Sequence, residues 1–169
     1  MVYMGAGSYG RQEETGMRLL NELQYSLGKL SSLGSYPFHL LMVILLYRLE
    51  LVQESLFLLV GFVLVYLLGI PLRIMLFRGR KGPEQQDIFL QRYHASSFPS
   101  FHSARIMFLA LFISDYFNFA MDVVVISIAL VVLVSYARII NRQHFMSDLV
   151  GGIVLGIVIW VGTTLVIQL

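Results

Sequence analysis

Long apolar runs separated by short polar segments dominate the chain. A helix needs about 20 consecutive apolar residues to cross the hydrocarbon core of a bilayer. Several runs approach that length, so the pattern predicts membrane-spanning helices. The five candidate spans are residues 37–51, 56–77, 102–119, 123–136 and 149–167. The one long polar stretch lies at residues 78–100.

The N-terminal region follows a different pattern. Residues 1–12 are rich in glycine and favour a flexible tail. Over residues 13–30, leucines recur at helical spacing between charged side chains, which is typical of an amphipathic helix. Such a helix lies on the membrane surface or packs on the loops of the protein itself, and both interpretations stay open.

Composition strengthens the membrane interpretation. Of the 169 residues, 57% are hydrophobic and 13% are charged, whereas soluble domains carry roughly 25% charged residues. We therefore expect one domain over residues 1–169, an all-α polytopic transmembrane helix bundle of about five spans plus the amphipathic helix. No cysteine is present, which excludes disulfides and thiolate metal sites. The net charge of +2 does not indicate nucleic-acid binding, and we expect no cleavable signal peptide.

The order of the spans predicts an uneven distribution of charge. With one crossing per span, the second and fourth spans end, and the third and fifth begin, on the same membrane face. That face then carries every basic residue except Arg48, together with six acids, and the other face carries Arg48 and four acids. Positive charge favours the cytoplasmic side. The candidate residues described next all fall on the basic face.

The first candidate group closes the second span and comprises Arg73, Arg78, Arg80 and Lys81. Basic residues often flank a span at the interface without further function. Arg73 does not fit that pattern, because apolar residues continue after it and a charge inside a span usually faces a polar interior. Arg73 and Arg80 are seven residues apart and would share one face of a continuous helix.

The second candidate group lies where the third span begins. Ser100 suits the N-cap of a helix, and His102 would stand in its first turn. The N–H groups at a helix N-terminus attract anions. A plain capped helix with an incidental histidine would give the same pattern.

The third candidate group is Arg138, His144 and Asp148, between the fourth and fifth spans. A histidine and an aspartate at i and i+4 would share a helix face. The carboxylate would then reach one ring nitrogen and leave the other available. The alternative is a structural pair that ties down a loop.

Together the three groups match the needs of phosphoryl transfer through a covalent phosphohistidine. His144 would be the nucleophile, Asp148 would fix its tautomer, and His102 would protonate the leaving oxygen. Basic side chains and helix amides would hold the phosphate oxygens. These phosphate-binding candidates are Arg73, Arg80, Ser100, the amides near Phe101 and His102, and Arg138. This chemistry requires no metal or other cofactor, and the three groups lack the acidic clusters that bind Mg²⁺.

At these residues the chain resembles the type 2 phosphatidic acid phosphatase superfamily of membrane lipid phosphatases. Its third motif, Ser-Arg, five residues, His, three residues and Asp, is matched by Arg138, His144 and Asp148, with Ala137 in place of the serine. Its second motif, Pro-Ser-Gly-His, reads Pro-Ser-Phe-His here, with Phe101 in place of the glycine.

The first motif of that superfamily is matched more loosely. Arg73 stands in place of its lysine, Arg78 and Arg80 stand at its arginines, and Lys81 stands in place of its proline. The resemblance spans residues 73–152 and implies a six-helix core, phosphate binding by Arg73, Arg80, Ser100 and Arg138, and catalysis by His102, His144 and Asp148. Arg78 and Lys81 are possible additional contacts. Phenylalanine at position 101 resists the close backbone approach that glycine permits, so it would narrow the pocket or select the shape of the substrate.

Three functions remain open from the sequence. The first is metal-independent hydrolysis of a lipid phosphate or pyrophosphate, with phosphate as product. The second is head-group transfer from the same phosphohistidine to an alcohol, and the third is lipid binding without catalysis, motivated by Phe101 and Ala137. We expect a multi-pass protein of the cell membrane; charge places the site in the cytoplasm, whereas the resemblance favours the outer side. Nothing in the sequence indicates an oligomer.

Overall fold

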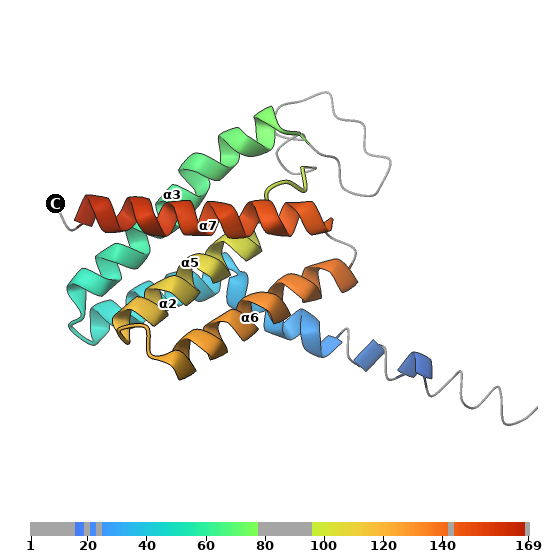
Figure 1. The fold of residues 1–169 in the computed structure, drawn as a ribbon, viewed down its shortest axis with the longest axis horizontal. Coiled ribbons are helices and arrows are strands. Elements are labelled where there is room, and N and C mark those ends of the chain that lie inside the picture. Colours follow the sequence, from blue (N-terminus) through green and yellow to red (C-terminus); the bar gives the residue numbers. More distant parts are fainter. Residues whose placement is uncertain (1–15, 19–20, 23–24, 78–95, 142–143, 168–169) are drawn as a thin grey trace, which may run out of the picture.

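The fold is a bundle of helices, shown in Figure 1. It is known from a computed structural model that describes residues 16–18, 21–22, 25–77, 96–141 and 144–167. The elements in chain order are η1 (Ser31–Gly34), α2 (Tyr36–Arg48), α3 (Val52–Met75), α5 (Phe101–Tyr116), α6 (Met121–Ile140) and α7 (Met146–Ile167). The all-α architecture that the hydrophobic pattern predicted is confirmed.

Each of the five predicted spans corresponds to one helix, with shifted ends. α6 continues to Ile140, so Arg138 lies in its last turn rather than after it. α7 begins at Met146, so Asp148 lies in its first turn whereas His144 precedes the helix. The expectation that both residues share a helix face was therefore wrong for His144.

Of the five predicted spans, only some are helices long enough to cross a membrane completely. α3, α6 and α7 are long and apolar enough, and a fourth span results if the helix Tyr25–Gly34 and α2, which are bent by 51°, count as one. α5 has 16 residues, about 24 Å of helix against a core of about 30 Å. It ends early because Asn118 and Phe119 turn into the left-handed region. α5 lies inside the bundle, where its neighbouring helices cover it, so it does not need the full length of a span that contacts lipid.

α5 is the centre of the bundle and packs against α3, α6 and α7. More than half of its residues are buried. Close approach of α7 depends on two glycines: a Cβ at Gly152 would lie 2.4 Å from the carbonyl oxygen of Ser100, and one at Gly156 would lie 2.5 Å from that of Ala104. Small residues four apart allow this kind of backbone contact between membrane helices.

Glycines also allow α3 to pack on α5. A Cβ at Gly61 would collide with the ring of Phe108, and a Cβ at Gly69 would lie 2.4 Å from the ring of Phe101. Each phenylalanine of α5 thus fills the space that a missing side chain leaves on α3. These two contacts fix the register of the helices and, with it, the position of Arg73 beside the start of α5.

The N-terminal helix packs on the bundle in the part that the structure describes. Residues 25–30 are helical, as expected, and continue into η1. Leu27 is buried, and a Cβ at Gly28 would lie 3.9 Å from Nδ2 of Asn141. This segment therefore lies against the end of α6, which favours packing on the protein itself over a purely interfacial position.

The outer faces of α3, α6 and α7 are apolar and exposed. Leucine, isoleucine and valine side chains that point away from the bundle include Leu67, Val125, Val132, Val154 and Leu165. In water such a surface is a docking or aggregation site, whereas in a bilayer it contacts lipid. Together with the three helices of spanning length, it identifies a membrane protein.

Candidate active site

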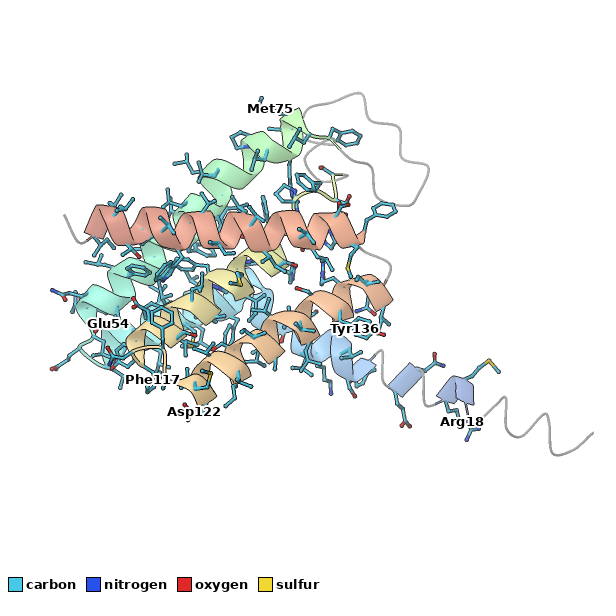
Figure 2. All side chains as sticks on the ribbon, viewed as in Figure 1. Arg18, Glu54, Met75, Phe117, Asp122 and Tyr136 are labelled. Atoms are coloured by element: carbon cyan, nitrogen blue, oxygen red, sulfur yellow. The ribbon has the colours of Figure 1, made fainter. Side chains whose placement is uncertain are left out.

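One end of the bundle gathers the candidate residues that the structure describes. Figure 1 shows that α3 and α6 end, and α5 and α7 begin, at the same end, on the right of the view. In Figure 2, Met75 and Tyr136 mark that end, whereas Glu54, Phe117 and Asp122 mark the opposite one. The convergence that the order of the spans predicted is therefore present among the described helices.

Ser100 caps α5, as its sequence position predicted. Its Oγ accepts hydrogen bonds from the backbone N–H of Ser103 at 3.4 Å and from the Ser103 hydroxyl at 3.2 Å. The hydroxyl of Ser135 on α6 in turn donates to Ser103 Oγ at 3.3 Å. This chain of buried hydroxyls joins the start of α5 to α6. The sequence analysis did not select Ser103 or Ser135. The signal for them was weak: Ser103 follows Ser100 by three residues, and Ser135 precedes Arg138 by three.

The start of α7 is tied directly to the start of α5. The backbone N–H of Ser100 donates to the carbonyl oxygen of Asp148 at 2.9 Å. Gly152, one turn further along α7, permits this approach. The predicted second and third motifs are thus joined directly, through Ser100 and Asp148.

His144 and Asp148 form a buried pair. Nδ1 of His144 lies 3.7 Å from Oδ2 of Asp148, an ion-pair distance that exceeds a hydrogen bond. The same carboxylate oxygen accepts the backbone N–H of Phe145 at 2.8 Å. Phe145 is the residue before the first turn of α7, so Asp148 closes the reciprocal half of a capping box. Asp148 therefore has the structural role that the sequence left open and also lies beside His144.

Arg73 reaches the start of α5 from the last turn of α3. Its Nε and Nη2 both donate to the carbonyl oxygen of Pro99, at 3.3 and 3.2 Å. The guanidinium lies 3.8 Å from the centre of the Phe101 ring. Arg73 is buried, as expected for a charge that faces the interior of the bundle.

Phe101 points toward α3. Its ring packs in the space beside Gly69 and meets Tyr66 edge-on, with centroids 5.5 Å apart. The Phe101 ring, which comes from α5, thus packs against α3 and contacts the Arg73 guanidinium there. This packing does not test the expectation that phenylalanine at this position would narrow the pocket. It does show that the ring contacts the Arg73 side chain and fills the space beside Gly69.

His102 lies in the first turn of α5, within electrostatic range of Arg73, Arg138 and His144. Its backbone is covered by η1, where a Cβ at Gly34 would lie 2.9 Å from the His102 carbonyl oxygen. The site therefore combines two histidines, one carboxylate and two arginines around the N-terminus of α5.

Arg105 is a residue that sequence reasoning did not select. It lies one turn after His102 and is buried, with Nε donating to the Gly34 carbonyl oxygen at 2.7 Å and Nη1 donating to the Tyr66 hydroxyl at 2.6 Å. Nε2 of His39 lies 3.0 Å from the Arg105 carbonyl oxygen. The signal was available, because Arg105 is a charge inside an apolar run. It connects α2, η1, α3 and α5 beneath the site.

Three candidates cannot be placed. Arg78, Arg80 and Lys81 lie outside the described residues. Their predicted contacts with phosphate stay predictions.

A family model for the PAP2 superfamily matches residues 76–169, more than half of the chain. The chain belongs to the PAP2 superfamily. The resemblance inferred from the motifs is thereby confirmed, and membership supports a phosphatase-type activity. Searches of curated proteins and of solved structures gave no match. The matched region contains His102, Arg138, His144 and Asp148 but begins after Arg73, whose place at the site rests on its contacts with Pro99 and Phe101.

Proposed function

We propose that the protein hydrolyses a lipid phosphate or pyrophosphate at the membrane interface through a covalent phosphohistidine. The observation that carries this proposal is the buried His144–Asp148 pair at the bundle end where α5 begins and Arg73 and Arg138 converge. Because α3, α6 and α7 are long enough to cross a bilayer, this end would lie at the level of the lipid head groups.

In the proposed reaction, Nε2 of His144 attacks phosphorus and forms the P–N bond as the bond to the leaving oxygen breaks. His102 gives its proton to that oxygen. Water then attacks the phosphohistidine, loses a proton to His102, and releases inorganic phosphate with neutral His144. Asp148 Oδ2, which lies 3.7 Å from Nδ1, would accept the Nδ1 proton once the pair tightens to hydrogen-bond distance around the substrate, and its charge would stabilise the positive charge that develops on the ring.

The phosphate oxygens would be held at the start of α5. Both acceptor positions of Ser100 Oγ are used by Ser103, so the hydroxyl proton of Ser100 is the group that would donate to phosphate. The amides of Phe101 and His102 and the helix dipole favour an anion at the same place. Arg73 and Arg138 would complete the phosphate site, with Arg80 as a third arginine and Arg78 and Lys81 as additional contacts.

The test is phosphate release in excess EDTA from a panel of lipid phosphates and pyrophosphates, using the full chain in liposomes. We expect His144→Ala to abolish release, and we expect a phosphorylated intermediate that is stable in base and labile in acid to form on the wild type. Release that survives His144→Ala would overturn the proposal.

Product analysis separates the other two functions. Transfer of phosphate to an added alcohol, with little inorganic phosphate, would indicate a transferase. Lipid binding with neither product nor adduct would indicate a non-catalytic member of the superfamily.

A further inference from the structure

Three buried serine hydroxyls form a chain from α6 to the start of α5. The Ser135 hydroxyl lies 3.3 Å from Ser103 Oγ, which in turn lies 3.2 Å from the Oγ of the helix cap Ser100. Ser100 and Ser103 are fully buried, and Ser135 is 6% exposed. The proposed mechanism uses the hydroxyl of Ser100 alone. Two hydroxyl groups inside the bundle are therefore left without a role in it.

These two hydroxyls differ from other buried serines in the way their hydrogen bonds are made. A buried serine in a helix commonly bonds a carbonyl oxygen of its own helix. Ser114 of α5 does so, since its hydroxyl donates to the Ala110 carbonyl oxygen at 2.8 Å. Ser103 and Ser135 instead bond across the contact between α5 and α6. Alanine would fill either place without burying a polar group, so packing alone does not require two hydroxyls there.

The chain of hydroxyls has two possible directions, and one of them leaves a proton for phosphate. A hydroxyl donates one hydrogen bond and accepts up to two. If Ser135 donates to Ser103 and Ser103 donates to Ser100, the last proton belongs to Ser100 at the N-terminus of α5. In the opposite direction the last proton belongs to Ser135, which makes no other hydrogen bond among the described residues. An anion at the start of α5 would accept the Ser100 proton and select the first direction.

We propose that Ser103 and Ser135 are positioning residues that direct the hydroxyl proton of Ser100 toward a phosphate oxygen. The inference rests on the proposed function for the role of Ser100 and adds two residues that act through it. The backbone N–H of Ser103 donates to Ser100 Oγ at 3.4 Å, in addition to the Ser103 hydroxyl. With both acceptor positions of this oxygen occupied, its own proton points in the remaining direction.

The chain also strengthens the last bond and links it to the arginine of α6. Hydrogen bonds in series polarise one another, so a hydroxyl that accepts a bond becomes a better donor. The gain is greatest where the final acceptor is charged, as a phosphate is. Ser135 precedes Arg138 by three residues and shares its face of α6. The same contact that orients Ser100 therefore holds the turn of α6 that carries Arg138 against the start of α5.

The first experiment compares two side chains of the same shape at position 135. Ser135→Thr keeps the hydroxyl, whereas Ser135→Val replaces it with a methyl group, and both add the same branch to the helix. The probe is inorganic phosphate, and its Kd is measured by calorimetric titration of the purified full chain in detergent. We expect Ser135→Val to bind phosphate about 2- to 10-fold more weakly than Ser135→Thr, the effect of one hydrogen bond between neutral groups.

The control removes a buried hydroxyl elsewhere on α5. Ser114→Ala loses the bond to Ala110 at the far end of the helix and should leave the Kd for phosphate unchanged. A hydroxyl with a purely structural role at position 135 would alter the midpoint of thermal unfolding and not the affinity. Equal Kd values for Ser135→Thr and Ser135→Val, or no binding of phosphate by the wild type, would overturn the inference.

The second experiment asks whether Ser103 acts through Ser100. We expect Ser103→Ala to weaken phosphate binding about 2- to 10-fold in the wild type but to cause no further loss in Ser100→Ala. Additive losses would show that Ser103 affects the site independently of Ser100 and would overturn the inference. Phosphate release from the lipid panel, measured on the same proteins, separates the two proposals. If phosphate binding depends on both serines but the wild type releases no phosphate from any lipid, the proposed function alone is refuted.

Discussion

The guanidinium of Arg73 lies 3.8 Å from the centre of the Phe101 ring, although the two residues belong to different helices. Phe101 replaces the glycine of the superfamily motif, and the space for its ring comes from Gly69, one turn before Arg73 on α3. The side chain that replaces glycine on α5 therefore fits because α3 has a glycine, and so no side chain, at the place where the ring lies. The ring gives Arg73 an aromatic face while Pro99 accepts its hydrogen bonds.

This contact predicts that Phe101 supports activity. Phe101→Leu keeps an apolar side chain of similar length but removes the aromatic face. A cation–π contact contributes about 0.5–2 kcal/mol, so we expect kcat/KM for phosphate release to fall by about 2- to 30-fold. Phe101→Tyr, which keeps the ring, is the matched control and should retain most of the activity. Faster hydrolysis by Phe101→Leu would show instead that the ring obstructs the pocket.

The packing of Phe101 shows what the sequence could not reveal. The motif spacing identified the departure from glycine, but the direction of the ring depends on Gly69, which is 32 positions away and has no local signature. Arg105 is a similar case. Its charge within an apolar run was visible, whereas its partners Gly34 and Tyr66 come from two other elements.

The helices themselves were predictable, because each apolar run is long and bounded by polar residues. Helix ends were less so. Apolar periodicity does not report where a cap forms, and the contact of Asp148 with the Phe145 N–H starts α7 three residues earlier than the apolar run indicated. The placement of Ser100, Arg138 and Asp148 at one end followed from the alternation of span directions alone.

Gly152 is predicted to be essential for the junction between α5 and α7. Gly152→Ala places a methyl group 2.4 Å from the Ser100 carbonyl oxygen, so the two helices must separate. Overpacking of this kind costs about 1–3 kcal/mol. We expect a lower midpoint of thermal unfolding in detergent, together with reduced phosphate release, since the hydrogen bond from Ser100 to Asp148 would be strained.

Gly162 offers the matched control for that experiment. It lies on the same helix, and a Cβ there meets nothing within 4 Å. Gly162→Ala should leave the midpoint unchanged or raise it, because alanine favours helix by about 1 kcal/mol. If the two substitutions changed the midpoint equally, the effect of Gly152 would arise within helix α7 and not from its contact with α5.

Arg105 is predicted to stabilise the region beneath the site. Lysine keeps the positive charge but cannot donate to Gly34 and Tyr66 at the same time with the geometry of a guanidinium. A hydrogen bond from a charged group contributes about 1.5–3 kcal/mol, so Arg105→Lys should lower the unfolding midpoint measurably. Arg48→Lys, at an exposed position on α2, is the control and should have no effect. An unchanged midpoint for Arg105→Lys would show that the hydrogen bonds from Arg105 to Gly34 and Tyr66 do not stabilise the fold.

Asp148 is predicted to have two separable roles. Asparagine retains an oxygen that can accept the Phe145 N–H, so Asp148→Asn should preserve the start of α7. It removes the negative charge beside His144. In the proposed mechanism that charge would stabilise the ring as it becomes positive, so we expect phosphate release to fall by about 10²- to 10⁴-fold with little change in the unfolding midpoint.

Asp148→Ala removes both functions and should lower the midpoint as well as the rate, since the loss of a cap costs about 1 kcal/mol. Asp115→Asn, at the far end of α5, is the matched control and should change neither. If Asp148→Asn retained wild-type activity, the carboxylate would serve only to cap α7, and the orientation of His144 would have to come from its other neighbours.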